Sequence, residues 1–301
     1  MAHYTKGPLT FGDQLLLLLR RGLHVEEPAR AMLYLERVGY YRLMGYLFPL
    51  RKPDSDEYQP GASFEAVIKL YEFDQVLRVL VMEAIGHIEV AVRTAVTYQF
   101  GHAYGAFGHL DPANVAFDSV WHAKWLTGVD EEVGRARETF IDHYKNRYTA
   151  PAFPRVPIWM ASEVMSLGTL SWLVKAMHTA DRKAVAARFN LRAPVFVSWL
   201  HAVSVVRNIS AHHGRCWNRV LGVKPVRPDD GSWQYMAALY PIDRMYFMLQ
   251  VLRALLKCCA ADAGAWRARV TDHLRPFLAI PENQRSMGAP PGWEHHPSWR
   301  A

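Results

Sequence analysis

The stretch from Phe64 to about Phe100 constrains the fold most, because it contains no proline and only one glycine, Gly86. Proline removes a backbone donor and breaks a helix, so its absence here predicts one very long helix, or two helices joined by a kink. Strict alternation of apolar and polar residues, which is typical of a half-buried strand, persists nowhere between turn signals. The sequence therefore predicts an all-α fold.

The remaining helices are expected between turn signals, at residues 10–22, 26–37, 121–148, 158–178, 182–189, 194–213, 241–259 and 262–279. Thr10 is placed to cap the first helix, and Gly22 to end it. We expect four parts in the chain: an N-terminal helical module (1–60), a helical core (61–220), a C-terminal helical extension (221–280) and a disordered tail (281–301).

The composition bounds the classes of partner. Half of the 301 residues are apolar or aromatic, which is enough for a sizeable core. Lysine and arginine number 35 against 28 acidic residues, a formal charge of +7. Such a balance favours polyanionic partners, nucleic acid first and an anionic membrane second.

Cysteine and histidine spacing argues against a metal or a cofactor. The three cysteines Cys216, Cys258 and Cys259 form no paired motif, which fits a reducing cytoplasm. The 14 histidines show no HExxH spacing, and neither a Walker-type loop nor a GxSxG elbow occurs. The N-terminus lacks a signal-peptide core, and no apolar run approaches the ~20 residues that span a bilayer. We expect a soluble cytoplasmic protein with no membrane partner, no metal and no cofactor.

The last part of helix 194–213 carries the most suggestive chemistry. Phe196, Leu200 and Val203 form a core stripe, and Arg207 falls next on it, where its guanidinium needs partners. Asn208 and His212 are four residues apart and share a face. Arg207 and His212 lie about 140° apart around an ideal helix, so their spacing permits a shared site without proving one.

An arginine and a histidine at this spacing can form a metal-free site for cutting RNA. Histidine exchanges a proton near neutral pH, and arginine holds a phosphate with a permanent charge and a planar fork of donors. We expect both to line a common, basic, partly open cleft. The alternative is structural: Arg207 in a buried ion pair, and His212 satisfying carbonyls at a helix end. A dense set of donors that can bind phosphate follows, namely His213, Arg215, Asn218 and Arg219, and Trp217 among them is an aromatic residue on which a base could stack.

The segment RNISAHHGRCWNR (207–219) resembles the signature of the bacterial abortive-infection (Abi) family, AbiD/AbiF type. Four further blocks resemble that family in the same order, at residues 9–23, 35–51, 70–94 and 157–173. The resemblance covers about residues 9–280. The Abi family is similar to the HEPN superfamily of all-helical domains with an Arg-x4-6-His motif, many of which are metal-independent endoribonucleases that act as dimers.

The resemblance implies a HEPN-like helical bundle, with its catalytic core at residues 61–220, that acts as a ribonuclease toxin of phage defence. Arg207 and His212 would be the catalytic pair, with Asn208 and His213 in support. RNA-binding residues would be Arg215, Trp217, Asn218, Arg219 and, in the block at residues 35–51, Arg42. Expected partners are RNA, a second copy in a homodimer, and an antitoxin protein or non-coding RNA. The alternatives are a non-catalytic RNA-binding or partner-binding HEPN protein, and a helical interaction protein in which the Arg-His pair is incidental.

Two carboxylates are candidates for a supporting role. Glu89 and Arg93 are four residues apart on the long helix, and we interpret them as a structural ion pair, with orientation of Arg207 or His212 by Glu89 as the alternative. Glu163 lies in an apolar stretch, which suggests a buried structural partner for Arg207 or Arg93.

Overall fold

The computed structural model describes residues 3, 5, 7–149 and 154–300, and it is all-α. Within these ranges no β-strand forms beyond isolated bridges, so the predicted fold class is confirmed. In the same ranges, no helix has the length and apolar character that crossing a bilayer requires.

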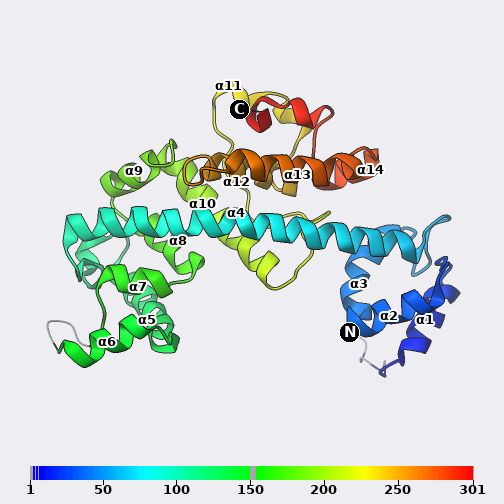
Figure 1. Ribbon diagram of the computed structural model, residues 1–301, viewed down its shortest axis with the longest axis horizontal. Helices are drawn as coiled ribbons and strands as arrows, with labels where there is room; N and C mark the ends of the chain where they lie inside the picture. The colour runs from blue at the N-terminus through cyan, green and yellow to red at the C-terminus, as the bar shows by residue number, and fades with distance from the viewer. Residues whose placement is uncertain (1–2, 4, 6, 150–153, 301) are drawn as a thin grey trace. The chain divides into compact units, whose positions relative to one another are not determined.

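The chain divides into two compact units, Met1–Leu77 and Arg78–Ala301, with the boundary inside the long helix α4 (Phe64–Tyr104). The two units are described separately below. α4 is continuous over 41 residues, as the missing prolines predict (Figure 1). The domain boundaries expected at residues 60 and 220 stay predictions.

The first unit holds α1 (Phe11–Arg20), α2 (Pro28–Arg37), α3 (Tyr40–Leu47), η1 (Phe48–Leu50) and the start of α4. The side chain of Thr10 caps α1 by accepting a hydrogen bond of 3.1 Å from the backbone N–H of Asp13. Gly22 follows the helix with a φ of 84°, a left-handed conformation that glycine adopts without strain. Both ends of α1 are therefore as the sequence predicts.

The second unit contains the rest of α4 and the remaining helices. These are η2 (Gly108–Leu110), η3 (Pro112–Asn114), α5 (Ser119–Arg135), α6 (Thr139–Arg147), α7 (Ile158–Val164), α8 (Leu167–Ala176), α9 (Thr179–Ala187), α10 (Ala193–Ala211), α11 (Gly231–Gln234), η4 (Ala237–Leu239), α12 (Met245–Leu256), α13 (Ala263–Leu278), α14 (Pro281–Met287), η5 (Trp293–His295) and α15 (Pro297–Arg300). The helix expected over 158–178 breaks after Val164, because the hydroxyl of Ser166 accepts a 3.2 Å hydrogen bond from the Thr169 N–H and starts α8.

α10 lies at the core of the second unit, packed against α8, α9 and α12. Its predicted core stripe is confirmed, because Phe196, Leu200 and Val203 are each at most 1% exposed, and the neighbouring Trp199 and Val206 are buried to the same extent. Burial of this stripe fixes the rotation of the helix about its own axis, and so decides which residues face solvent.

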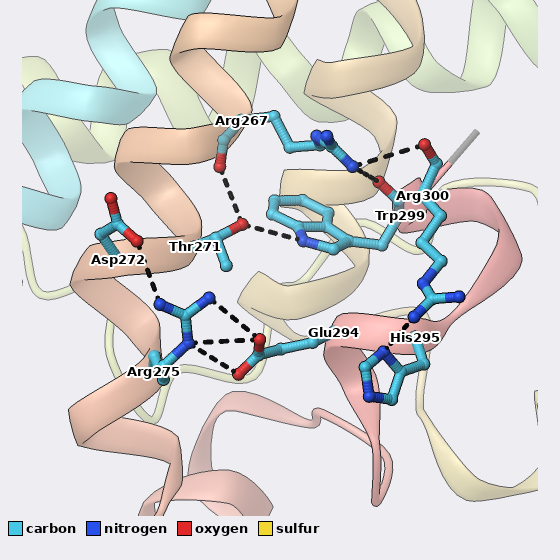
Figure 2. Close-up of polar contacts among 8 residues, drawn as sticks. All are labelled: Arg267, Thr271, Asp272, Arg275, Glu294, His295, Trp299 and Arg300. Atoms are coloured by element: carbon cyan, nitrogen blue, oxygen red, sulfur yellow. Dashed lines mark hydrogen bonds and ion pairs between the residues drawn. The ribbon is translucent and has the colours of Figure 1, made fainter.

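The sequence after Pro281, which we expected to be disordered, is helical and packed onto α13 up to Arg300; Ala301 lies outside the described residues. Trp299 is 1% exposed, and its indole N–H donates to Thr271 Oγ1 over 3.2 Å (Figure 2). Arg275 of α13 binds the carboxylate of Glu294. The proline- and glycine-rich composition suggested disorder, but two buried tryptophans, Trp293 and Trp299, anchor this segment.

Two arginines hold the backbone of this segment. Arg253 of α12 is 6% exposed, and its Nη1 donates to the carbonyl of Ser298 over 2.8 Å. Arg267 of α13 donates to the carbonyls of Trp299 and Arg300 (Figure 2). Burial, with the nearby charge of Arg267, lowers the pKa of Arg253 to about 10. The carbonyl groups of the C-terminal segment therefore satisfy donors of two arginines, one on α12 and one on α13.

We expect Trp299→Ala to lower the free energy of unfolding by about 3–5 kcal/mol, because it empties a buried indole site. Urea unfolding followed by far-UV circular dichroism measures this loss. Arg285→Ala is the control in the same segment, since its ion pair with Glu282 is exposed and should contribute under about 1 kcal/mol. Equal stability of the two variants would mean that the segment is not docked in solution.

Candidate functional site

α10 ends in a Schellman motif that brings two histidines to the surface. His212 is the C-cap residue, and His213 follows in the left-handed region with a φ of 54°. The N–H groups of His213 and Gly214 donate to the carbonyls of Ser210 and Ile209 over 3.0 Å and 2.7 Å. The helix thus ends at Ala211, and His213 rather than Gly214 takes the left-handed position.

Gly214, which follows this cap, is required by a close approach of the backbone rather than by a left-handed conformation of its own. A Cβ at this position would lie 3.0 Å from the carbonyl oxygen of Ile209 and 3.2 Å from its Cγ2, which is too close for any larger residue without movement. The close approach lets the chain turn back over the last turn of α10.

Arg207 has no carboxylate partner among the described residues, so the expected buried ion pair does not form there. Its Nη1 lies 3.4 Å from Asn208 Oδ1, a long hydrogen bond, and its enclosed Nε finds no acceptor in the described part of the chain. The side chain is half-buried. A guanidinium held without an anion is a ready partner for one.

Asn208 contacts one of the two predicted catalytic residues and shares a helix face with the other. Its amide oxygen is the acceptor for Arg207, and it lies four residues before His212 on the same exposed face of α10. His212 is exposed at the helix end. None of the five hollows found in the described structure is lined by Arg207, Asn208 or His212, so the cleft expected around this pair stays a prediction.

Trp217 does not form the exposed stacking surface that the sequence suggested. It is 3% exposed and packs edge-on against Phe277 of α13, with ring centroids 6.5 Å apart. The guanidinium of Arg215 lies 5.9 Å from the Trp217 ring centroid. An aromatic residue among polar neighbours looks exposed in the sequence, but here it fills a core site against a helix 60 residues later.

The other predicted RNA-binding residues make contacts within the protein. Asn218 has a φ of 49°, and its side-chain oxygen accepts a 3.2 Å hydrogen bond from Arg244. Arg219 donates to the carbonyl of Arg215 over 3.3 Å. Arg42 is exposed on α3 of the first unit, so its contribution to a site in the second unit stays a prediction.

The two carboxylates have different outcomes. Glu89 and Arg93 form the expected ion pair, and Arg93 also donates to the carbonyl of Ser162. Glu163 is exposed on α7, so the expectation of a buried partner for Arg207 or Arg93 is wrong. The backbone carbonyl of the preceding residue, Ser162, is instead a partner of Arg93, and a sequence pattern cannot reveal a main-chain partner.

A second polar group lines a hollow of about 540 Å³ beside α5, and our sequence reasoning did not include it. His109 is 2% exposed, and its Nδ1 has no hydrogen-bond partner in the described residues. Arg155, also on the wall, binds both carboxylate oxygens of Asp130. Burial, with the charge of Arg155, lowers the pKa of His109 to about 4, which keeps the imidazole neutral. Neither in this hollow nor elsewhere do the described residues bring together three side chains that could bind a metal ion.

We expect the protein to lose stability as the pH falls from about 6.5 to 4. The pKa of His109 is lower in the folded state than its ordinary value, so its neutral form stabilises the fold above pH 6.5 and protonation favours unfolding below it. The loss would be about 3 kcal/mol at ~1.4 kcal/mol per pKa unit. Unfolding midpoints across this pH range measure it, and His109→Gln should flatten the curve. The same slope in that variant would assign the loss to other groups.

The comparisons with known proteins place the chain in a family. A family model described as "Abi-like protein" matches residues 33–218, which is more than half of the chain and includes Arg207 through Asn218. No curated protein and no solved structure matches the chain significantly. Membership of this family supports a role in abortive infection, a form of phage defence. The chain belongs to the family of Abi-like proteins.

Proposed function

We propose that this protein is a metal-independent endoribonuclease that acts in phage defence. One observation carries the proposal: Arg207, a cation with no carboxylate partner in the described chain, lies at the same open helix end as the exposed His212. Asn208 contacts the first and shares a face with the second. The donors of a structural arginine are instead satisfied, by a carboxylate as for Arg93 or by backbone carbonyls as for Arg253, whereas the enclosed Nε of Arg207 has no acceptor in the described chain.

The reaction would use the ribose 2′-hydroxyl as nucleophile. His212 would take the proton from this hydroxyl, or give one to the leaving 5′-oxygen. Arg207 would stabilise the charge on the phosphorane-like transition state. The 2′-oxygen forms a bond to phosphorus as the bond to the 5′-oxygen breaks, which leaves a 2′,3′-cyclic phosphate and a free 5′-hydroxyl. DNA lacks the nucleophile and would remain intact.

A homodimer would complete this chemistry. One imidazole cannot be the neutral base and the protonated acid in the same step, so an efficient site needs a second proton-transfer group. A twofold axis near the end of α10 would bring two copies of His212 together, one in each role. His213 is the alternative second group within one chain, adjacent to His212 at the same helix end.

The decisive test is cleavage of RNA in the presence of EDTA. We expect the unaltered protein to cut total RNA. His212→Ala should lose roughly 100- to 10,000-fold in rate, because positioned proton transfer contributes about that much. Arg207→Ala should lose roughly 100- to 1,000-fold, as removal of a donor that stabilises transition-state charge does. His87→Ala, which removes an exposed histidine from α4, is the matched control and should retain activity. Mass spectrometry of the fragments should find cyclic phosphate ends.

The variants also separate catalysis from binding alone. If His212→Ala is folded and cuts as fast as the unaltered protein, His212 is not catalytic and the proposed function fails. If neither the unaltered protein nor any of the variants cuts RNA, but all of them bind it, the non-catalytic RNA-binding alternative holds.

We expect the protein to be a dimer at the concentrations at which it cuts RNA. Light scattering over a concentration series measures its mass, and activity should rise with the dimer fraction. An active protein that remains a monomer throughout would assign the second proton transfer to the same chain. His213→Ala would then be the variant to examine first.

A further inference from the structure

The exposed face of α10 continues from His212 to a second feature. His201, Val205, Asn208 and His212 follow one another at spacings of four, three and four residues and are not buried, so they form one solvent-facing stripe. At the other end of this stripe, α8 and α10 enclose a hollow of about 250 Å³. We call it the Trp172 hollow. Its walls include Trp172, Lys175, Pro194, Val197 and His201.

The walls of the Trp172 hollow combine an aromatic face with a cation. Trp172 is 41% exposed, although tryptophan is ordinarily among the more buried residues. The Nζ of Lys175 lies 4.5 Å from the centroid of its ring, and Lys175 makes no ion pair within the described chain. Pro194 and Val197 add apolar surface. The hollow therefore offers stacking together with positive charge.

His201 adds a hydrogen-bonding group that carries no charge near neutral pH. Its ring centroid lies 6.2 Å from that of Trp172. Partial burial and the nearby charge of Lys175 lower the pKa of His201. A neutral imidazole has one donor nitrogen and one acceptor nitrogen, so it can meet either kind of group on the edge of a planar ring.

We propose that the Trp172 hollow binds a base of single-stranded RNA, whose backbone then follows the exposed stripe of α10 to Arg207 and His212. The proposal rests on the proposed function and specifies its substrate as unpaired RNA. Proteins grip single strands by stacking bases on aromatic rings beside basic groups that hold the backbone. Trp172 would stack on the base, Lys175 would approach a phosphate, and His201 would contact the edge of the base.

The spacing along α10 suits a strand that reaches both sites. His201 and His212 are 11 positions apart, which at ~1.5 Å per residue is about 16 Å along the helix axis. A few nucleotides cross this distance, so the base in the Trp172 hollow would not be the one at the cleaved bond. It would select where along the strand the cut falls.

Binding is tested first in a protein that cannot cut. In the His212→Ala background, fluorescence anisotropy measures the affinity for a labelled single-stranded RNA. Base stacking predicts that adding Trp172→Ala weakens binding roughly 5- to 100-fold. Trp172→Phe should preserve most of the affinity. Trp159→Ala removes another exposed tryptophan, 47% exposed on α7, and should have no effect.

Two further substrates test the chemistry of recognition. The same RNA annealed to its complement should bind no better to the protein with Trp172 than to Trp172→Ala, because paired bases cannot enter the hollow. An RNA that lacks bases along its whole length should likewise erase the difference between the two proteins. In the cutting protein, Trp172→Ala should change the pattern of cleavage sites while His212 remains essential.

The outcomes distinguish failure of the base-binding subsite from failure of the proposed ribonuclease function. If RNA is cut in a His212-dependent manner but binding and cut sites ignore Trp172→Ala, the base subsite is overturned and the proposed function stands. If binding depends on Trp172 but no RNA is cut, the subsite stands and the ribonuclease fails. If Trp172→Ala changes only the mass in light scattering, the face is an interface between copies and the subsite is overturned.

Discussion

The burial of one stripe of α10 is the constraint on which the candidate site depends. A helix that buries Phe196, Trp199, Leu200, Val203 and Val206 against three neighbours cannot rotate about its axis without exposing large apolar side chains. Each such side chain stabilises the fold by about 1.5–3 kcal/mol through removal from water. The opposite stripe, from His201 to His212, is held toward solvent by the same packing. The core therefore orients the polar chemistry, although it contributes no functional group.

Much of the fold follows from local patterns in the sequence. The continuous α4, the capping of α1 by Thr10 and the core stripe of α10 each depend on neighbours within a few residues, so their signals are in the sequence itself. The break between α7 and α8 was missed because Ser166, which caps α8, lies within an apolar run. The C-terminal segment was wrongly predicted to be disordered because its local composition resembles that of a loop. Its order comes from Trp299 and from arginines of earlier helices, which are contacts far apart in the sequence.

The candidate site was predictable in its residue types but not in its surroundings. Arg207 and His212 could be chosen as candidates because they fall at the end of an apolar helix, where a polar or charged side chain is unusual unless it has a partner or a function. The burial of Trp217 depends on Phe277, and the partner of Arg93 includes the backbone of Ser162. Such partners are far away in the sequence or lie on the main chain, where residue identity carries no signal. The Trp172 hollow joins residues of two helices and could be recognised only after they were packed together.

The Schellman motif at the end of α10 limits how this chain can vary. Each residue added within the helix after Arg207 would turn the following positions by about 100° around the axis. The exposed histidine would then move toward the core, and the close fit of Gly214 against Ile209 would be lost. In this chain, a change of a single residue in the spacing between Arg207 and His212 would therefore require the end of α10 to be rebuilt. Insertions and deletions in descendants of this chain should accumulate outside the segment that runs from Arg207 to Gly214.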